Sequence, residues 1–346
     1  MNIYLNGRYL TQKLTGVQRF AFEITKQLHE CYKNDLIILL PNNIDICKSY
    51  NDIQFNIKNI GINKGHLWEQ LDLPIYLLKK SKPLLINLTN SAPVLYDNKI
   101  STIHDLSVLY KNWYNKFYSI FYKFMIPRIL RNSKKILTVS QFTKKCILVN
   151  YNIDADNITI IYNGISKEFE KIEKNIKKEN YILFVGSNNK RKNLGNLLKA
   201  FQSLNDSNLT LKLIGINKED LKNYDINFKN IECLGHIYGN KLYNYYRNAK
   251  IFIYPSYYEG FGIPLIEAMA SGCPAIASDI DVFKEICDDA VMYVDPHDYN
   301  DIKDKIFFLN NNKKKCSELV DKGYKIIKKF SWKTESKKIV DCINKI

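Results

Sequence analysis

Residues 181–201 have the sequence YILFVGSNNKRKNLGNLLKAF, and this stretch decides the fold. Tyr181–Val185 is an apolar run with the length of a buried strand. Gly186 then opens a polar turn that ends in the basic run Lys190–Asn193, and apolar residues recur at helical spacing from Leu194 to Phe201. A strand that passes through a turn into a helix is the repeating unit of a parallel α/β sheet.

The same alternation of strand and helix extends outward from this unit into both halves of the chain. Further strands are predicted at Asn2–Leu5, Leu36–Leu40, Leu84–Leu88, Ile100–Ile103, Ile136–Val139, Leu211–Ile214, Ile251–Tyr254 and Ala275–Ala277. The polar run from about Ser166 to Asn180 is the predicted break between the halves. A length of 346 residues suits two domains. We therefore expect an α/β protein with two Rossmann-like, doubly wound domains facing a central cleft, where ligands meet the carboxyl ends of the strands.

Composition limits the classes of function. The chain has 51 Lys and Arg against 35 Asp and Glu, so its formal charge of +16 favours anionic partners. The eight cysteines are scattered and form no C-x-x-C pair, which is typical of reduced thiols rather than of a disulfide framework or a zinc site. No run of 18 apolar residues and no signal-peptide pattern is present. A cytoplasmic location is the expectation.

The sequence EGFGIPLIE, from Glu259 to Glu267, carries the most chemistry. Gly260 and Gly262 permit a tight turn close to a ligand, and Pro264 suits the first turn of a helix. The backbone N–H groups at such a helix start favour an anion. One carboxylate could then bind sugar hydroxyls and the other ribose hydroxyls, with phosphates between them. The alternative, a loop–helix corner with two solvated glutamates, does not account for the glycines, the proline and the spacing together.

This segment, continued through Pro274, closely resembles the E-x7-E motif of the retaining glycosyltransferases of family 4. The strand–helix layout resembles their GT-B fold over essentially the whole chain. The resemblance implies an acceptor-side domain over residues 1–166 and a nucleotide-sugar-binding domain over residues 179–329. It also implies that the last helix, residues 330–346, packs back on the N-terminal domain.

The resemblance assigns further site residues. Lys192 matches a lysine that binds the donor diphosphate, and Gly186 matches the glycine that ends the preceding strand. Many members have an arginine directly after that glycine, where this chain has Ser187, so Arg191 is the expected second cation. His104 matches a histidine that contacts the transferred sugar. The expected catalytic residues are His104, Glu259, Lys192 and Arg191, and the expected donor-binding residues are Gly16, Gly186, Lys192, Arg191, Gly260, Phe261, Gly262, Leu265 and Glu267.

The implied reaction is the retaining transfer of a hexose from a nucleoside diphosphate sugar to a glycan or lipid-linked oligosaccharide. Mannose from GDP-mannose is the first expectation and a UDP-sugar the second, in the assembly of surface polysaccharide such as lipopolysaccharide. No cofactor, metal or nucleic acid is expected. A peripheral contact with the anionic inner face of the membrane is expected. The alternatives are a nucleotide-sugar 2-epimerase on the same fold, a nucleic-acid-binding protein that uses the positive charge, and an inactive sugar-binding homologue. The aromatic and basic segment Tyr110–Arg131 is expected to be an amphipathic packing helix rather than a membrane-surface helix.

Overall fold

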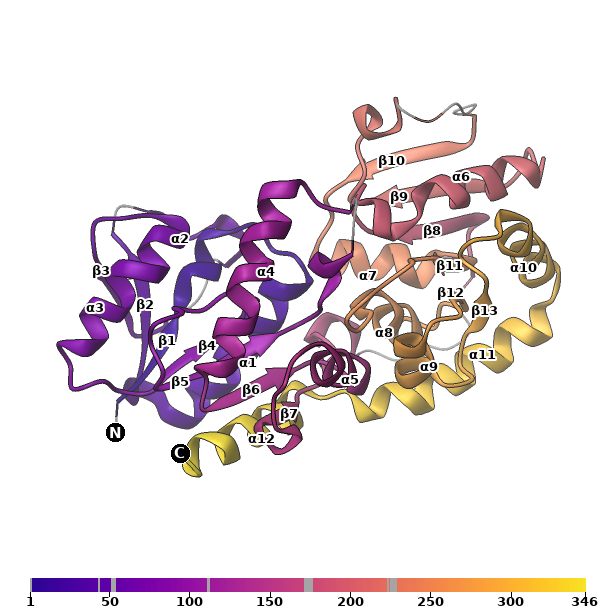
Figure 1. Ribbon diagram of the computed structural model, residues 1–346. Coiled ribbons are helices and arrows are strands. Elements are labelled where there is room, and N and C mark those ends of the chain that lie inside the picture. The colour runs from indigo at the N-terminus through magenta and orange to yellow at the C-terminus, as the bar shows by residue number, and fades with distance from the viewer. Residues whose placement is uncertain are drawn as a thin grey trace. The chain divides into compact units, whose positions relative to one another are not determined.

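The computed structural model describes residues 2–42, 44–50, 54–110, 113–170, 177–222, 224 and 229–346. The chain divides into two compact units (Figure 1). The first comprises residues 1–164 together with 331–346, and the second comprises residues 165–330. Within the predicted break at 166–180, residues 171–176 lie outside the described part of the chain.

The first unit contains a seven-stranded parallel sheet in the order β3-β2-β1-β4-β5-β6-β7. Its strands are β1 (Ile3–Asn6), β2 (Leu36–Pro41), β3 (Ile57–Ile60), β4 (Leu85–Asn87), β5 (Lys99–Ile103), β6 (Lys135–Thr138) and β7 (Ile158–Ile160). Its helical segments are α1 (Gly16–Tyr32), α2 (Gly65–Leu67), η4 (Trp68–Asp72), α3 (Leu73–Leu78), α4 (Lys116–Arg131), α5 (Gln141–Asn150) and α12 (Trp332–Asn344). Buried side chains between helices and sheet form its core.

The second unit repeats this plan with six parallel strands in the order β10-β9-β8-β11-β12-β13. These are β8 (Tyr181–Val185), β9 (Thr210–Ile214), β10 (Ile231–Gly235), β11 (Ile251–Tyr254), β12 (Ala275–Ser278) and β13 (Met292–Val294). The helices are α6 (Leu194–Ser203), α7 (Gly239–Asn248), α8 (Ile263–Ala270), α9 (Asp281–Cys287), α10 (Tyr299–Asn311) and α11 (Lys313–Ile326). One continuous apolar core joins strands β8, β9 and β11 to helices α6 and α10.

Strand order reverses once in each sheet. The chain builds β1, β2 and β3 outward in one direction and then returns to place β4 on the other side of β1. The second unit does the same at β8 and β11. Loops that leave the carboxyl ends of two such neighbours diverge, and the opening between them is where doubly wound sheets bind ligands. The candidate site therefore lies after β8 and β11.

All nine strands expected from the sequence are present, and the α/β class is confirmed. The four strands that were not predicted, β3, β7, β10 and β13, are the outermost strands of the two sheets.

Candidate functional site

The loops after β8 and β11 are joined by several hydrogen bonds. The backbone N–H of Tyr257 donates to the carbonyl of Arg191 at 2.8 Å, and Nη1 of Arg191 donates to the carbonyl of Tyr258 at 3.1 Å. Asn193, which has a left-handed φ of 58°, donates through Nδ2 to the carbonyls of Pro255 at 2.9 Å and Pro296 at 2.6 Å. These bonds fix the basic turn against the loop that carries Glu259.

Glu259 contacts both cations of this turn. Its Oε2 lies 2.6 Å from Nη1 of Arg191, and its Oε1 lies 2.6 Å from Nζ of Lys192. The three side chains are only 8%, 17% and 10% exposed, respectively. Lys192 also donates to the hydroxyl of Tyr254, the last residue of β11. The result is a buried cluster with two positive charges and one negative charge at the strand-order reversal of the second sheet.

The cations control the protonation state of Glu259. Burial alone would raise the pKa of the Glu259 carboxyl, but Arg191 and Lys192 outweigh that effect and lower the pKa to about 2. Glu259 is therefore ionised at neutral pH. Burial and the Glu259 charge raise the pKa of Tyr254 well above its usual value, so this hydroxyl stays protonated. The cluster carries a net charge of about +1, which suits an anionic ligand.

The turn between Glu259 and α8 takes the conformation expected for its glycines. Gly262 precedes α8 with φ of 116°, a region that L side chains rarely adopt, and a Cβ there would lie 2.9 Å from the Phe283 ring. The N–H of Leu265 donates to the carbonyl of Gly262 at 2.9 Å, so it is not available to an anion. The side chains of Phe261 and Leu265 are buried, so a ligand at the turn could contact these two residues only through their backbone.

Glu267 occupies the second turn of α8 and is only 3% exposed. The hydroxyl of Tyr246, on α7, donates to Oε2 of Glu267 at 3.0 Å. Gly186 is close to the basic turn, because a Cβ at Gly186 would lie 3.8 Å from Cδ of Lys192. Sequence reasoning missed Tyr246 and Tyr254. Tyr254 carried a usable signal, since it ends a predicted central strand, whereas Tyr246 is one of several tyrosines on an otherwise polar helix.

The remaining expected site residues belong to the first unit. His104 follows β5 and is 6% exposed, and its Nε2 lies 2.9 Å from the carbonyl of Leu88. A carbonyl can only accept, so Nε2 carries the proton. Burial lowers the pKa of His104, which leaves Nδ1 as an acceptor at neutral pH. Gly16 is exposed and is the first residue of α1.

A second polar cluster occupies the strand-order reversal of the first sheet. Arg8, just after β1, donates through Nε to Oε1 of Glu69 at 3.3 Å and through Nη2 to Ser91 at 2.7 Å. Glu69 is fully buried and also accepts from Asn6 at 2.8 Å and from Ser91 at 3.0 Å. Burial would raise the pKa of Glu69, but Arg8 and His66 lower it overall. Sequence reasoning missed this cluster, and no local motif connects its members.

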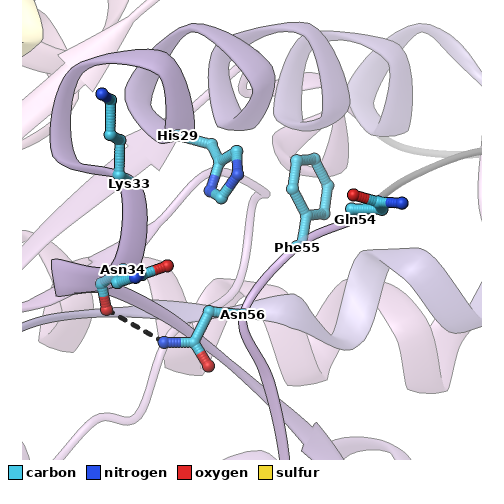
Figure 2. A pocket seen from close by; sticks show the side chains of 6 residues that line it. All are labelled: His29, Lys33, Asn34, Gln54, Phe55 and Asn56. Carbon is cyan, nitrogen blue, oxygen red and sulfur yellow. Dashed lines mark hydrogen bonds between the residues drawn. The ribbon is translucent and has the colours of Figure 1, made fainter.

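Figure 2 shows a pocket elsewhere in the first unit, lined by His29, Lys33, Asn34, Gln54, Phe55 and Asn56. Nδ2 of Asn56 donates to the carbonyl of Asn34 at 2.9 Å across this pocket. His29 lies in the last turn of α1, and the other lining residues immediately precede β2 and β3, so the pocket lies at the amino ends of these strands. Doubly wound sheets bind their ligands at the opposite ends, so we do not assign it a role in the candidate site.

The described residues contain no group of three or more His, Cys, Asp or Glu side chains placed to hold a metal ion. None of their helices is both long enough and apolar enough to cross a membrane.

Comparison with known proteins identifies the family. The profile "Glycosyl transferases group 1" matches residues 166–326, and the profile "Glycosyltransferase Family 4" matches residues 15–169. The O-antigen chain mannosyltransferase RfbU of Salmonella typhimurium is 30% identical over 82% of this chain and 84% of its own length. The chain is a family 4 glycosyltransferase.

Other relatives agree with this assignment. The O-antigen chain mannosyltransferase B of Escherichia coli is 27% identical to this glycosyltransferase over 69% of this chain and 68% of its own length. The solved structure of WaaG, a glycosyltransferase involved in lipopolysaccharide biosynthesis, aligns with a TM-score of 0.77 at 14% identity and covers 99% of both chains. Anabaena Alr3699/HepE in complex with UDP-glucose aligns with a TM-score of 0.78 at 14% identity, again over 99% of both chains. The two structures show the shared fold, which is GT-B.

Proposed function

We propose that this glycosyltransferase moves a hexose from a nucleoside diphosphate sugar to a glycan or lipid-linked oligosaccharide with retention of anomeric configuration. The cluster of Arg191, Lys192 and Glu259 carries the proposal, because it places two cations at the strand-order reversal of the second unit. Mannose from GDP-mannose is the proposed donor, and the support for mannose is that the two O-antigen relatives are mannosyltransferases. A UDP-sugar is the second candidate, supported by the HepE complex, whose fold this chain shares.

In the proposed reaction, Lys192 and Arg191 bind the donor diphosphate, and Glu267 binds the ribose hydroxyls. As the bond between C1 of the sugar and the diphosphate breaks, these cations stabilise the negative charge on the leaving group. The acceptor hydroxyl forms the new bond to C1 on the same face, and its proton passes to the leaving phosphate. Glu259 orients the sugar, and Nδ1 of His104 accepts a hydrogen bond from a sugar hydroxyl. No metal is required in this scheme.

The first test measures thermal unfolding of the protein with GDP, UDP and ADP in turn, in the presence of EDTA. A nucleotide at about 100 times its dissociation constant should stabilise the fold by roughly 2.7 kcal/mol. A shift with GDP alone supports a GDP-sugar donor, and a shift with UDP alone supports the second candidate. Absence of a shift with all three would contradict the metal-independent donor site.

A matched pair of variants tests the residue assignment. Lys192→Met should weaken binding of the preferred nucleotide by roughly 10- to 100-fold, because a charge-assisted hydrogen bond to the diphosphate is lost. Lys199→Met removes an exposed lysine from α6 and should leave binding unchanged. Equal affinities for the two variants would remove Lys192 from the site. Release of an epimerised nucleotide sugar without transfer to any acceptor would instead favour the 2-epimerase.

A further inference from the structure

Exposed apolar side chains concentrate on the first unit. Of the seventeen large hydrophobic residues that are exposed in the described part of the chain, eleven lie between Ile62 and Phe124. Such side chains normally face the core, and a monomeric protein rarely collects many of them on one surface without a partner. Two helical segments, α2-η4-α3 and α4, carry most of this group.

The continuous helical segment α2-η4-α3 is apolar on two faces. Its inner face buries Trp68, Leu73 and Leu77 in the core. Its outer face exposes four residues at intervals of four, four and three: Leu67 at 62%, Leu71 at 49%, Ile75 at 51% and Leu78 at 58%. This spacing places the four side chains in one stripe along the helix.

Helix α4 has the same double character. It packs on the core through Tyr122, Met125, Ile126, Ile129 and Leu130, as expected for a packing helix. On its outer side Phe117 is 87% exposed, Ile120 is 65% exposed and Phe124 is 54% exposed. These three positions also follow helical spacing. The packing interpretation of this segment is therefore incomplete, because it accounts for only one of the two apolar faces.

The two stripes face the same side of the sheet. The β3-to-β4 and β5-to-β6 crossovers both move along the sheet in the same direction, so right-handed connections put their helices on one face. The His66 ring, on α2, lies 4.8 Å from the Phe121 ring, on α4. Leu95 is 88% exposed and follows Val94 in the chain. The N–H of Val94 donates to Gln70 of η4 at 2.9 Å, and its carbonyl accepts from Asn132, at the end of α4, at 3.0 Å. Leu95 thus lies between the two helices.

Basic side chains accompany both stripes. Lys79, Lys80 and Lys82 follow the end of α3, and exposed cations on α4 alternate with its aromatic residues. Over residues 106–153 the sequence has nine Lys and Arg and no Asp or Glu. The Arg128 guanidinium lies 3.3 Å from the centre of the Phe124 ring, which joins charge and apolar surface in a single contact.

We propose that this basic apolar face docks on an anionic lipid bilayer. The face comprises Leu67, Leu71, Ile75, Leu78, Leu95, Phe117, Ile120 and Phe124 with Lys79, Lys80, Lys82, Lys116, Lys123, Arg128 and Arg131. The apolar side chains enter the boundary between headgroups and acyl chains, and the cations bind lipid phosphates. A second copy of the chain fits less well. Although Lys82 pairs with Asp97, α4 has four cations and no Asp or Glu, so a symmetric contact would bring together two faces with a large excess of positive charge. The inference rests on the proposed function only in that it brings the enzyme to a lipid-linked acceptor.

The test is co-sedimentation of the full chain with vesicles of phosphatidylethanolamine and phosphatidylglycerol, compared with vesicles of phosphatidylcholine. Binding should require the anionic lipid and should weaken as salt rises. The charge variant Lys116→Glu with Lys123→Glu should weaken binding by roughly fivefold or more for each cation removed. The apolar variant Phe117→Ser with Phe124→Ser should weaken it at least about tenfold.

The control is Phe307→Ser with Phe308→Ser, which removes two aromatic residues that are 62% and 45% exposed on α10 of the other unit. Its vesicle binding should equal that of the unaltered protein. The nucleotide-dependent thermal shift should be the same in all variants, so a failure of the donor site and a failure of this surface give different results. Unchanged vesicle binding by both face variants would overturn the proposal. So would a dimer in sedimentation velocity that the Phe117→Ser with Phe124→Ser variant dissociates.

Discussion

Glu259 is the counter-charge of the cations that are proposed to bind the donor. Each carboxylate oxygen lies 2.6 Å from one cationic nitrogen, so a diphosphate that reaches Lys192 and Arg191 must compete with this carboxylate. In exchange, the two cations hold Glu259 in one orientation before any sugar arrives. Orientation before binding is what a group needs when it is to contact a substrate through a short, directional hydrogen bond.

Glu259→Gln should therefore separate binding from turnover. Without the carboxylate, GDP or UDP should bind at least as tightly as before, because the net positive charge of the cluster increases. Transfer should fall by about 100-fold or more, because the neutral amide no longer orients the sugar through charged contacts. Calorimetric titration and an initial-rate assay measure the two effects. A parallel loss of nucleotide affinity would show that Glu259 supports binding rather than catalysis.

The same substitution should change the acid stability of the protein. Because the pKa of Glu259 is about 2 in the folded chain and near 4.5 in the unfolded chain, its ionisation contributes stability that is fully present above pH 4.5. That contribution, about 3 kcal/mol, is lost as the pH falls toward 2. Urea unfolding at several pH values should show a shallower decline for Glu259→Gln. An identical decline in both proteins would mean that the pKa is not lowered.

The residue types of this cluster could be predicted from the sequence, but their pairing could not. Motifs indicate Lys192 and Glu259, and Arg191 is the expected second cation because Ser187 replaces the usual arginine; the cations are assigned to phosphate and the carboxylate to sugar. The ion pairs join residues 67 and 68 positions apart, and only the adjacency of β8 and β11 brings them together. The Arg8–Glu69 pair of the first unit went unpredicted for the same reason, since its partners are 61 residues apart.

Whether a strand could be predicted from the sequence depends on its position in the sheet. A central parallel strand is covered on both faces and is apolar throughout, as β11 is, with all four residues buried. An outermost strand is partly solvated: β3 has the sequence IKNI, and only Ile60 is buried. Short mixed segments of this kind resemble loops in a single sequence. The periodicity of α4 gave a helix correctly, but it could not indicate that an aromatic stripe remains outside the core.

Gly262 offers a test of the turn that begins α8. Gly262→Ala should lower the free energy of unfolding by about 3 kcal/mol, because the side chain meets both an unfavourable φ and the Phe283 ring. Gly239→Ala is the matched control in the same unit: its φ is +58, and nothing lies within 4 Å of an added Cβ. That control should lose only about 1 kcal/mol. Equal losses in chemical denaturation would show that crowding at Phe283 has no effect.

On the scale of the whole molecule, the chain builds one unit from two separate segments. Helix α12 belongs to the first unit, where the Trp332 ring lies 6.0 Å from Phe20 of α1. Oε2 of Glu335 accepts the backbone N–H of Tyr162 at 2.9 Å, and Ile339 and Ile343 are buried. The chain therefore passes through the second unit before it completes the first.

Trp332→Ala should act on the first unit alone. Loss of a buried tryptophan lowers the free energy of unfolding by about 3–5 kcal/mol. Hydrogen exchange should accelerate in α1, which packs against α12, while the protection of β8 and α6 in the second unit stays unchanged. Acceleration of equal size in both units would show instead that they unfold as one cooperative body.

The late position of α12 has a consequence during protein synthesis. When the ribosome has finished residue 164, the helix that covers Phe20 has not yet been translated, and the whole of the second unit must be made before it appears. The nascent first unit thus spends that interval with the side of α1 that packs on α12 uncovered. At typical elongation rates of about 5–20 residues per second, the interval is on the order of ten seconds or more, long enough for chaperones to bind.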